Sequence, residues 1–548
     1  MGIEVGIMTI FRGKTVDFAL AGLCSVMLLA ACGGGGSSSQ SAPPPVSQPG
    51  GNVWTQGQFA AASQFKDLCA APRSGSDLNG NAFSDRAGTL SDELFWLRSW
   101  SDETYLWYNE ITDRNPNGFT DRLAYFDELK TTATTASGNP RDRFHFTYDS
   151  EDWLRLTTSG ASASYGARFA LVASSPPRDI RVAFIEPGSP AATAGLSRGM
   201  KVITVNGVDA VNGTDTNALN AGLFPDGGGE TYAFEFQRLD GTRFTTSLTS
   251  AIVTADPVNA VSVLTQNGRR YGYIHFTTFS PRTAEEALFD AFDQLQAANI
   301  DDLVLDLRYN GGGLLAIASQ LSYMVAGPDR TRGRNFETLQ FNNKANGINP
   351  VTGNRITPTP FYSNGQNFTV ASSRSAPSVS KPRVFVLTTG RTCSASEAVM
   401  NGLRGIDVDV IQIGERTCGK PYGFYATDNC GITYFTIQFR GVNDKNFGDY
   451  ADGFAPGEAP SSLGDVMPGC QISDDFGHAL GDTDEALFAT AIAYAETGTC
   501  PAGTVPNRKI DGPADLAQTL GHTDPALDLT RDPRIQAREL AETWDARE

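Results

Sequence analysis

The sequence predicts a multidomain α/β protein, and three observations support this fold class. The chain has 548 residues, which is enough for several domains of about 100 to 200 residues each. Across residues 254–505, apolar runs of strand length alternate with helical patterns, as in parallel sheets covered by helices. Residues 158–253 contain short strands and glycine-rich turns, and residues 53–157 have a helical pattern rich in aromatic side chains. We therefore expect an N-terminal helical domain, a β-domain and an α/β domain, in that order.

The first 31 residues are typical of a secretion signal. Basic residues precede an apolar run over residues 18–31, which is too short to span a membrane comfortably as a permanent helix. The run ends in LAAC, which resembles the bacterial lipoprotein signal, in which the cysteine is lipidated and becomes the mature N-terminus. The resemblance implies a lipid anchor on Cys32, a flexible tether over residues 32–52 and, because Gly33 follows, the periplasmic face of the outer membrane in a Gram-negative host. An ordinary signal peptide with an incidental cysteine is the alternative.

The composition limits the partners of this chain. Its net charge is −18, so nucleic acid is not an expected partner. The four histidines are scattered without the spacing of metal ligands, and we expect neither a metal nor another cofactor. The tail over residues 506–548 contains several prolines and is charged at its end, so we expect helical pieces on the surface or partial disorder.

Six cysteines follow the signal and Cys32, and an oxidising envelope compartment favours disulfides among them. Six cysteines allow many pairings, and sequence cannot choose between them. The short intervening segments favour Cys418 with Cys430 and Cys470 with Cys500. Cys393 is then a small buried residue or pairs elsewhere.

Residues 158–253 carry a set of turn motifs. The sequence IEPGSPAA at residues 185–192 is followed by a short strand and an Asn-Gly turn at residues 206–207. Turn, short helix and Asn-Gly hairpin occur in the order found in PDZ domains, which this segment resembles. The resemblance implies a loop whose backbone N–H groups bind a terminal carboxylate, with the peptide added as a strand; a small β-domain without a ligand is the alternative. The matching loop consists of Tyr165, Gly166, Ala167, Arg168 and Phe169.

The α/β part begins with a strand over residues 272–276, and a capping box between Thr283 and Glu286 predicts the start of the next helix. The apolar run at residues 303–307 is interrupted by one acid, as expected of a buried parallel strand. It leads directly into the glycine loop RYNGGG, residues 308–313. Such a succession predicts a site at the C-terminal ends of the strands.

A second loop of this kind, TCSASE at residues 392–397, lies between a strand over residues 383–387 and a helix over residues 398–403. Ser394 would be displayed at the helix entrance as a nucleophile. The N–H of Ala395 could then stabilise an oxyanion, because the first N–H groups of a helix are unpaired and carry partial positive charge. An N-cap role for the serine is the alternative.

Three motifs occur in order after the PDZ-like segment: the glycine loop, the Ser394 loop and GERTCGK at residues 414–420. Together they resemble the C-terminal processing peptidases. The resemblance implies that Ser394 is the nucleophile, that Lys420 is its base, and that Gly311 or Gly312 supplies a second oxyanion donor beside Ala395. A lysine acts as base near neutral pH only when burial lowers its pKa of about 10.4 by roughly three units.

One departure concerns the orientation of Lys420. Many members of the family have a glutamine four residues after the lysine, and this chain has Phe424 there. The sequence therefore predicts a Ser–Lys dyad, unless Gln438 or another polar group reaches the site. A disulfide at Cys418 would clamp the loop around the base.

The resemblances together predict a lipid-anchored serine endopeptidase. Its partners would be polypeptide substrates with accessible C-termini, recognised by the PDZ-like domain, and the membrane through the anchor on Cys32. An adaptor protein is a further partner that the family resemblance suggests. Two alternatives remain, a catalytically inactive peptide-binding or scaffold protein that keeps the fold, and an esterase or amidase on small substrates.

Overall fold

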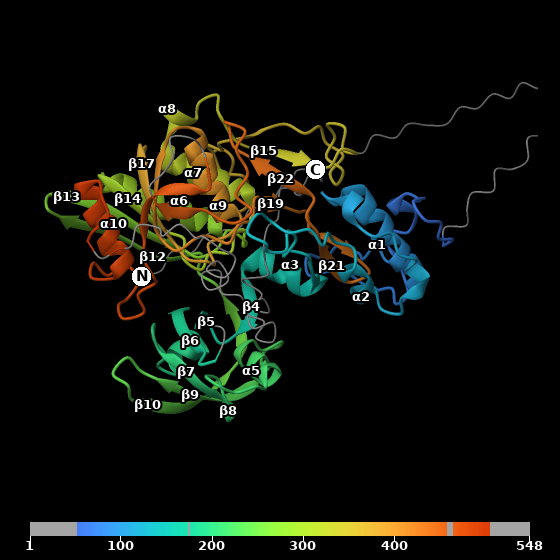
Figure 1. The fold of residues 1–548 in the computed structure, drawn as a ribbon, viewed down its shortest axis with the longest axis horizontal. Helices are drawn as coiled ribbons and strands as arrows, with labels where there is room; N and C mark the ends of the chain where they lie inside the picture. The colour runs from blue at the N-terminus through green and yellow to red at the C-terminus, as the bar shows by residue number, and fades with distance from the viewer. Residues whose placement is uncertain (1–51, 174–175, 458–463, 503, 505–548) are drawn as a thin grey trace, which may run out of the picture. The chain divides into compact units, whose positions relative to one another are not determined.

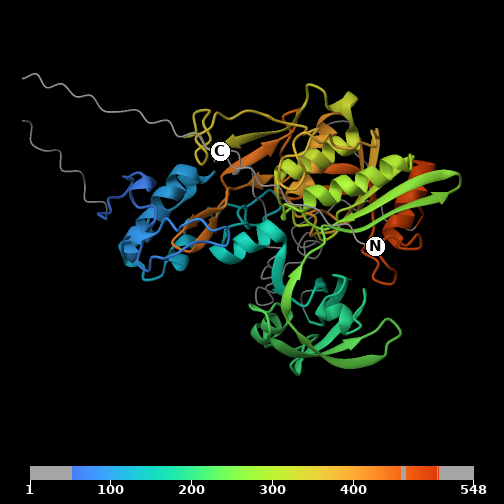
Figure 2. The same cartoon turned by 180° about the vertical axis from the view of Figure 1, so that it is seen from behind.

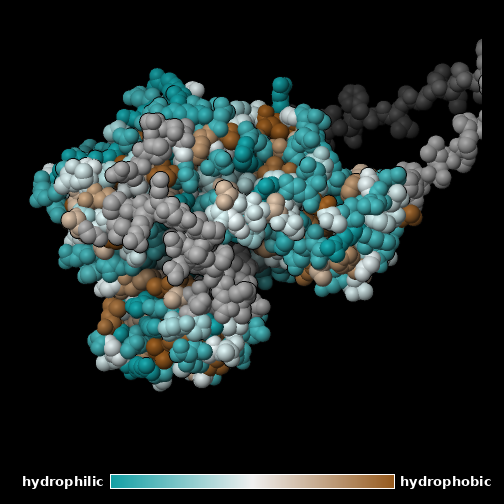
Figure 3. All heavy atoms as spheres, viewed as in Figure 1, coloured by the Kyte–Doolittle hydropathy of each residue, from teal (hydrophilic) through white to brown (hydrophobic). Residues whose placement is uncertain are grey.

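The structure is a computed structural model that describes residues 52–173, 176–457, 464–502 and 504. The predicted signal, Cys32, the tether up to residue 51 and the tail over residues 506–548 lie outside the described residues. Among the helices of the described part, none is long and apolar enough to cross a membrane. The face drawn in Figure 3 is largely hydrophilic with scattered apolar side chains, which fits the excess of acidic residues in the composition.

The first region contains short helices and small strands. Its elements are η1 (Ala62–Gln64), β1 (Leu68–Cys69), β2 (Arg86–Ala87), α1 (Leu90–Thr104), η2 (Tyr108–Glu110), η3 (Pro116–Gly118), α2 (Arg122–Asp127), β3 (Phe146–Asp149) and α3 (Ser150–Ser159). Helix α1 begins after Thr89, which exchanges capping hydrogen bonds with Asp92. It buries Trp96 and Trp100, whose rings stack at a centroid distance of 5.1 Å. The aromatic side chains that crowd this part of the sequence thus form its core.

The second region is a β-structure. Its elements are β4 (Ala161–Ser164), β5 (Ala167–Ala173), β6 (Asp179–Ile185), α4 (Pro190–Thr193), β7 (Lys201–Val205), β8 (Val208–Asp209), α5 (Thr216–Leu223), β9 (Thr231–Gln237), β10 (Arg243–Thr249) and β11 (Ala251–Thr254). Six strands form one sheet in the order β10-β9-β7-β6-β5, with β8 paired to β7. Asn206 and Gly207 make the turn between β7 and β8, with the positive φ angles of 48° and 79° that such a turn favours.

The third region is the α/β part. Its elements are β12 (Val258–Gln266), β13 (Arg269–Phe276), α6 (Ala284–Ala297), β14 (Asp302–Asp306), α7 (Leu315–Ala326), α8 (Pro328–Thr331), β15 (Asn335–Phe341), β16 (Thr359–Pro360), β17 (Arg383–Thr388), α9 (Ala395–Gly405), β18 (Asp409–Gly414), β19 (Tyr422–Gly423), β20 (Thr427–Asn429), β21 (Ile432–Phe435), β22 (Phe439–Val442), β23 (Ala455–Gly457), β24 (Val466–Gln471) and α10 (Ala486–Thr497).

Seven of these strands form the central sheet, in the order β12-β13-β14-β17-β18-β24-β23. Figure 1 labels β12, β13, β14 and β17 of this sheet. Every neighbouring pair is parallel except β12 with β13. Helices α6, α7 and α9 share one apolar cluster with the sheet, and α10 belongs to a second cluster. Figure 2 shows α6 and α7 side by side over the sheet. The predicted α/β core with parallel strands is therefore present.

Two sequence-based predictions about this part are wrong. The predicted Cys418–Cys430 pair does not form, because Cys430 bonds to Cys69 and Cys418 bonds to Cys393. The hairpin of β20 and β21 carries Cys430 away from Cys418, since β21 pairs with β3 of the first region. The predicted bond between Cys470 and Cys500 is confirmed.

The second error concerns the start of α6. Thr283 makes no side-chain capping bond, because its own backbone is already helical, with φ −61° and ψ −17°. The turn begins earlier, where the Ala284 N–H donates to the Pro281 carbonyl. The Glu286 N–H is instead bonded to the hydroxyl of Thr369.

Candidate active site

The three loops singled out in the sequence lie at one edge of the central sheet. The glycine loop follows β14, the loop with Ser394 follows β17, and the loop with Lys420 follows β18. These strands are parallel neighbours, so their C-terminal ends meet at the same edge. Backbone bonds join the loops: the Cys393 N–H donates to the Asn310 carbonyl, and the Cys418 N–H donates to the Thr392 carbonyl, each over 3.0 Å.

Ser394 has a backbone conformation that costs free energy. Its φ of 61° and ψ of −111° lie in a region that residues with a Cβ rarely adopt. The residue is 2% exposed, and its Oγ makes no hydrogen bond to any described residue. Ser394 is thus the residue before α9, but its hydroxyl does not cap the helix. A strained, buried and unbonded hydroxyl at a helix entrance is typical of a nucleophile rather than of a cap.

The glycine loop approaches this serine closely. A Cβ added to Gly312 would lie 2.9 Å from the Ser394 Cβ and 3.0 Å from the Ala395 nitrogen, and Gly312 has a φ of +108°. Only glycine fits there, because a Cβ would fill the space beside the serine. The Gly312 N–H donates to Asn310 Oδ1 over 2.9 Å. Ala395 is the first residue of α9, so its N–H has no partner inside the helix.

Lys420 shares a small pocket with Ser394. Its side chain is buried, with 1% of the residue exposed. Its Nζ lies 4.1 Å from the ring centroid of Phe424 and 5.0 Å from that of Phe144. The other residues that line the pocket are Leu315, Glu337, Ala398, Pro421, Tyr422, Phe439 and Tyr450.

Gln438, the polar residue that could have replaced the missing glutamine, does not bond to Lys420. Its Oε1 accepts a hydrogen bond from the Tyr425 N–H over 2.7 Å, and its Nε2 has no partner among the described residues. The aromatic ring of Phe424 lies beside the lysine instead.

Glu397 joins the serine loop to the lysine loop, a role that sequence reasoning missed. Its Oε2 accepts from the N–H groups of Ser394 (2.9 Å) and Lys420 (2.8 Å). Its Oε1 accepts from the Gly419 N–H (2.8 Å) and the Thr417 hydroxyl (2.5 Å). Burial raises the pKa of Glu397, while these four hydrogen bonds oppose the rise. The signal in the sequence was Glu397 itself, three residues after Ser394, as in a capping box.

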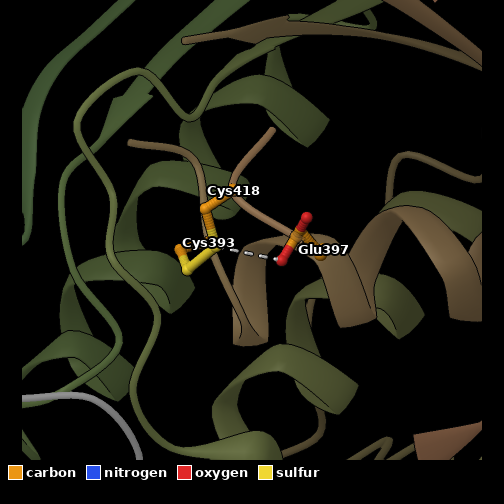
Figure 4. Close-up of side chains that lie close together, drawn as sticks. All are labelled: Cys393, Glu397 and Cys418. Carbon is orange, nitrogen blue, oxygen red and sulfur yellow. Dashed lines mark hydrogen bonds between the residues drawn. A yellow bond between two sulfur atoms is a disulfide. The ribbon is translucent and has the colours of Figure 1, made fainter. Parts of the chain in front are cut away.

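The disulfide between Cys393 and Cys418 forms a second link between the same two loops (Figure 4). Cys393 immediately precedes the serine, and Cys418 lies two residues before the lysine. Figure 4 shows Glu397 beside this bridge, and the Cys418 Sγ lies 3.4 Å from Glu397 Oε2. The two sulfurs and the carboxylate are close enough to hold a metal ion, but in this structure the sulfurs are bonded to each other.

A buried network of charged side chains lies at the start of the glycine loop. Arg308 is fully buried and donates to Asp306, Asp474 and Glu485. Burial raises the pKa of Asp306, but the Arg308 guanidinium outweighs this effect and holds the pKa at about 2. Asp306 and Arg308 therefore stay charged, and their ion pair fixes the first residues of the glycine loop.

Of the predicted carboxylate loop, only Tyr165 and Gly166 lie between β4 and β5, and residues 167–169 are instead the start of β5. Gly166 has a φ of +74°, and its N–H lies 3.3 Å from the Ser164 hydroxyl. Tyr165, Ala167, Arg168 and Phe169 are buried. Strand β5 ends the strand order of its sheet among the described strands. The Arg168 guanidinium donates to the carbonyl of Tyr309 over 3.2 Å, so the start of β5 contacts the segment that carries the glycines.

Residues 270–424 match peptidase family S41, a segment that includes the glycine loop, Ser394 and Lys420. The chain is similar to carboxyl-terminal processing proteases. It is 26% identical over 268 residues to such a protease of a Picosynechococcus species, which covers 49% of this chain and 56% of that protein. It is 28% identical over 246 residues to the carboxy-terminal processing protease CtpA of Bacillus subtilis, which covers 44% of this chain and 45% of that protein.

The chain spans about half the length of the curated relatives that it matches. Among solved structures, a candidate S41 protease from Bacteroides fragilis aligns with a TM-score of 0.56 and 22% identity. The alignment covers 74% of this chain and 97% of that protein. This similarity shows that the two proteins share a fold.

Proposed function

We propose that this homologue of the carboxyl-terminal processing proteases is a serine endopeptidase in which Ser394 is the nucleophile and Lys420 is the base. The observation that carries the proposal is the strained Ser394, which has an unbonded hydroxyl, Gly312 in close contact and Lys420 in the same pocket. Ser394, Lys420 and the N–H groups of Ala395 and the glycine loop lie at one edge of the sheet, and in their proposed roles they are the set that acyl transfer needs.

The reaction follows from these positions. Lys420 Nζ accepts the proton of the Ser394 hydroxyl as Oγ bonds to the carbonyl carbon of the substrate. The oxyanion that forms is stabilised by the Ala395 N–H and by the glycine loop, where Gly311 is the better donor because the Gly312 N–H is bonded to Asn310. The lysine ammonium then gives its proton to the leaving amine, and water hydrolyses the acyl-enzyme. Since Ser394 Oγ is unbonded here, the Ser394–Lys420 hydrogen bond forms when substrate binds.

The test uses the protein without residues 1–32 and an unstructured model polypeptide. The unmutated protein should cut it, and Ser394→Ala and Lys420→Ala should each reduce cleavage at least about a thousandfold. Ser396→Ala is the matched control, because that hydroxyl donates to the Asn310 carbonyl and takes no part in the reaction. Cleavage of small esters alone would favour the esterase alternative.

We further propose that the segment 158–253 acts as a PDZ domain and selects substrates by their C-terminal ends. The position of β5 at the end of its sheet supports addition of a peptide strand, with the loop over residues 165–169 near its start. A substrate with an amidated C-terminus should therefore have a KM roughly tenfold higher than the same substrate with a free carboxylate. Equal KM values would argue against carboxylate recognition.

The proposed location is the cell envelope, with the lipid on Cys32 at the periplasmic face of the outer membrane, where an adaptor protein could deliver substrates. The proposal rests on the sequence before residue 53. Labelling with a fatty-acid analogue should mark the full chain, and Cys32→Ala should abolish both the label and the association with membranes. A labelled Cys32→Ala variant would refute the anchor.

An inactive peptide-binding protein is the second candidate, favoured by Phe424 and by the unbonded Ser394 hydroxyl. This candidate predicts that the unmutated protein binds the C-terminal end of the model polypeptide and leaves it intact.

A further inference from the structure

Two aromatic rings flank the amino group of Lys420. The Nζ lies 4.1 Å from the centroid of the Phe424 ring and 5.0 Å from that of Phe144. Both distances are within the range of about 6 Å over which a ring face attracts a cation. The lysine is 1% exposed, Phe424 0% and Phe144 4%, so little water screens the attraction. Cation–π contacts are strongest when they are desolvated in this way.

The Phe424 ring is held firmly in place. It packs edge-on against Phe435 at 5.1 Å and against Phe146 at 5.8 Å. Phe424 and Phe435 are both fully buried, and they belong to one apolar cluster with Phe144.

The Phe144 backbone is fixed from the first region of the chain. Its N–H donates to Asp142 Oδ1 over 3.0 Å, and the other carboxylate oxygen of Asp142 accepts from the Tyr105 hydroxyl over 2.8 Å. Because its neighbours already fix the ring, binding of the amino group of Lys420 does not have to order the ring first. The ring can therefore define where that group lies.

We propose that Phe424 and Phe144 are positioning residues for Lys420, which hold its amino group beside Ser394 and stabilise the ammonium that forms when it takes the serine proton. The ring face attracts only the charged form, so the contact strengthens as the Oγ–H bond breaks and the Nζ–H bond forms. Burial keeps a lysine amine neutral and therefore able to accept a proton, but it also penalises the ammonium that forms. The rings offset part of that penalty at the moment of proton transfer. Phe424 thereby performs the orienting task of the absent glutamine.

Other charged and titratable groups around Lys420 stay the same in the experiments below. Glu397 accepts from the Lys420 N–H, and Arg143 donates to the Cys418 carbonyl over 2.9 Å. The remaining ionisable residues of the pocket are Glu337, Tyr422 and Tyr450.

The inference rests on the proposed function, and its test alters only the ring electrons. Phenylalanines with one, two and three fluorine atoms are incorporated at position 424, because fluorine withdraws the negative charge of the ring face while shape and burial are nearly kept. The pH dependence of kcat/KM is measured for each protein on the model polypeptide. The midpoint of the acid limb should fall stepwise by about one pH unit in total, because the ammonium loses stabilisation. The maximal kcat should decline roughly threefold, as expected of a weaker base.

Substitutions by standard amino acids distinguish a positioning role of the Phe424 ring from a packing role. Phe424→Leu should lower kcat roughly tenfold with a similar shift of the acid limb, and Phe424→Gln should recover part of kcat through a hydrogen bond to Nζ. Phe292→Leu is the matched control, because it removes a fully buried ring of another apolar cluster and should lower stability without moving the acid limb. An unchanged midpoint across the fluorinated series would overturn the proposal, as would an equal shift in Phe292→Leu.

A second readout distinguishes failure of this inference from failure of the proposed function. The titration of the lysine side chains is followed by NMR of protein labelled with ¹³C at Cε, and Lys420 is assigned by its absence from Lys420→Arg. The Lys420 titration midpoint should fall along the fluorinated series even in the Ser394→Ala background. If the protein never cuts but shows this trend, the proposed peptidase function is refuted and the aromatic contact is supported. If the protein cuts but the trend is absent, the aromatic contact is refuted and the peptidase function is supported.

Discussion

Replacing the carboxylate of Glu397 by an amide tests whether the serine and lysine loops are held in register by one side chain. The two carboxylate oxygens accept four hydrogen bonds, three of them from the backbone N–H groups of Ser394, Gly419 and Lys420. Glu397→Gln leaves one oxygen that can accept two of these bonds. If that oxygen keeps Ser394 and Lys420, the new NH₂ group can donate to the Thr417 hydroxyl, but it faces the Gly419 N–H, which becomes a buried donor without a partner.

The magnitude follows from this count. An unsatisfied buried N–H costs about 1 to 3 kcal/mol, and each hydrogen bond that changes from a charged to a neutral acceptor loses about 1 kcal/mol. Removing a buried charge offsets part of this loss of stability, because burying the Glu397 carboxylate is itself unfavourable, as its raised pKa indicates. We expect the free energy of unfolding to fall by about 3 kcal/mol. If most of this strain is expressed in the alignment of the two loops, kcat/KM should fall roughly a hundredfold.

The assay combines urea unfolding with kcat/KM on the model polypeptide, measured where both proteins are fully folded. Glu285→Gln is the matched control: Glu285 is also fully buried and also accepts hydrogen bonds from backbone N–H groups, those of residues 366, 368, 369 and 370, away from the serine and lysine loops. It should lose similar stability and keep its activity. The reasoning is refuted if Glu397→Gln loses stability with unchanged kcat/KM, or if both variants lose activity equally.

Three further predictions concern the same site. Replacing Cys393 and Cys418 together by alanine should cost about 3 kcal/mol of stability and most of the activity. The Cys470/Cys500 double variant, whose disulfide closes a loop of similar length, should cost similar stability and leave kcat/KM unchanged. Activity that survives loss of the first bridge would contradict the view that this disulfide holds the serine and lysine loops together. Gly312→Ala should lower kcat about a hundredfold, because its Cβ would meet Ser394 and Ala395, and a normal rate would contradict the close approach of the glycine loop. Burial, with Asp474 nearby, raises the pKa of Glu415 from 4.5 to about 7, so the folded state binds the extra proton and stability falls as pH rises through this window. Glu415→Gln should therefore be more stable than the unmutated protein by about 2 to 3 kcal/mol at pH 8 and equal to it near pH 4, and a gain that does not depend on pH would contradict this assignment.

Local patterns were sufficient to predict the elements around the site. The strand before Ser394, the helix after it and the strand before the glycine loop lie where apolar runs and glycines predicted them, as β17, α9 and β14. These signals are local because a buried parallel strand is apolar throughout and a loop that approaches another backbone needs glycine. The meeting of the three loops also followed from the pattern, since the C-terminal ends of parallel neighbouring strands share an edge.

Signals that depend on distant pairing were beyond the sequence. The Cys418–Cys430 prediction failed because loop length says nothing about which hairpin carries a cysteine to which neighbour, and β21 takes Cys430 to the first region. The role of Glu397 was missed because a capping pattern describes only contacts within its own helix, whereas this carboxylate also binds the next loop.

The sequence by itself determined which residues are proposed to carry the chemistry, because Ser394, the glycine loop and Lys420 are each marked by neighbours within a few positions. Only the tertiary structure decided how the lysine is held. Phe424 looked like the loss of an orienting amide, and the fold turns its ring toward the Nζ of Lys420 while bringing Phe144 from a segment far earlier in the chain. The physical reason is that burial and ring orientation depend on long-range packing, which no local pattern encodes.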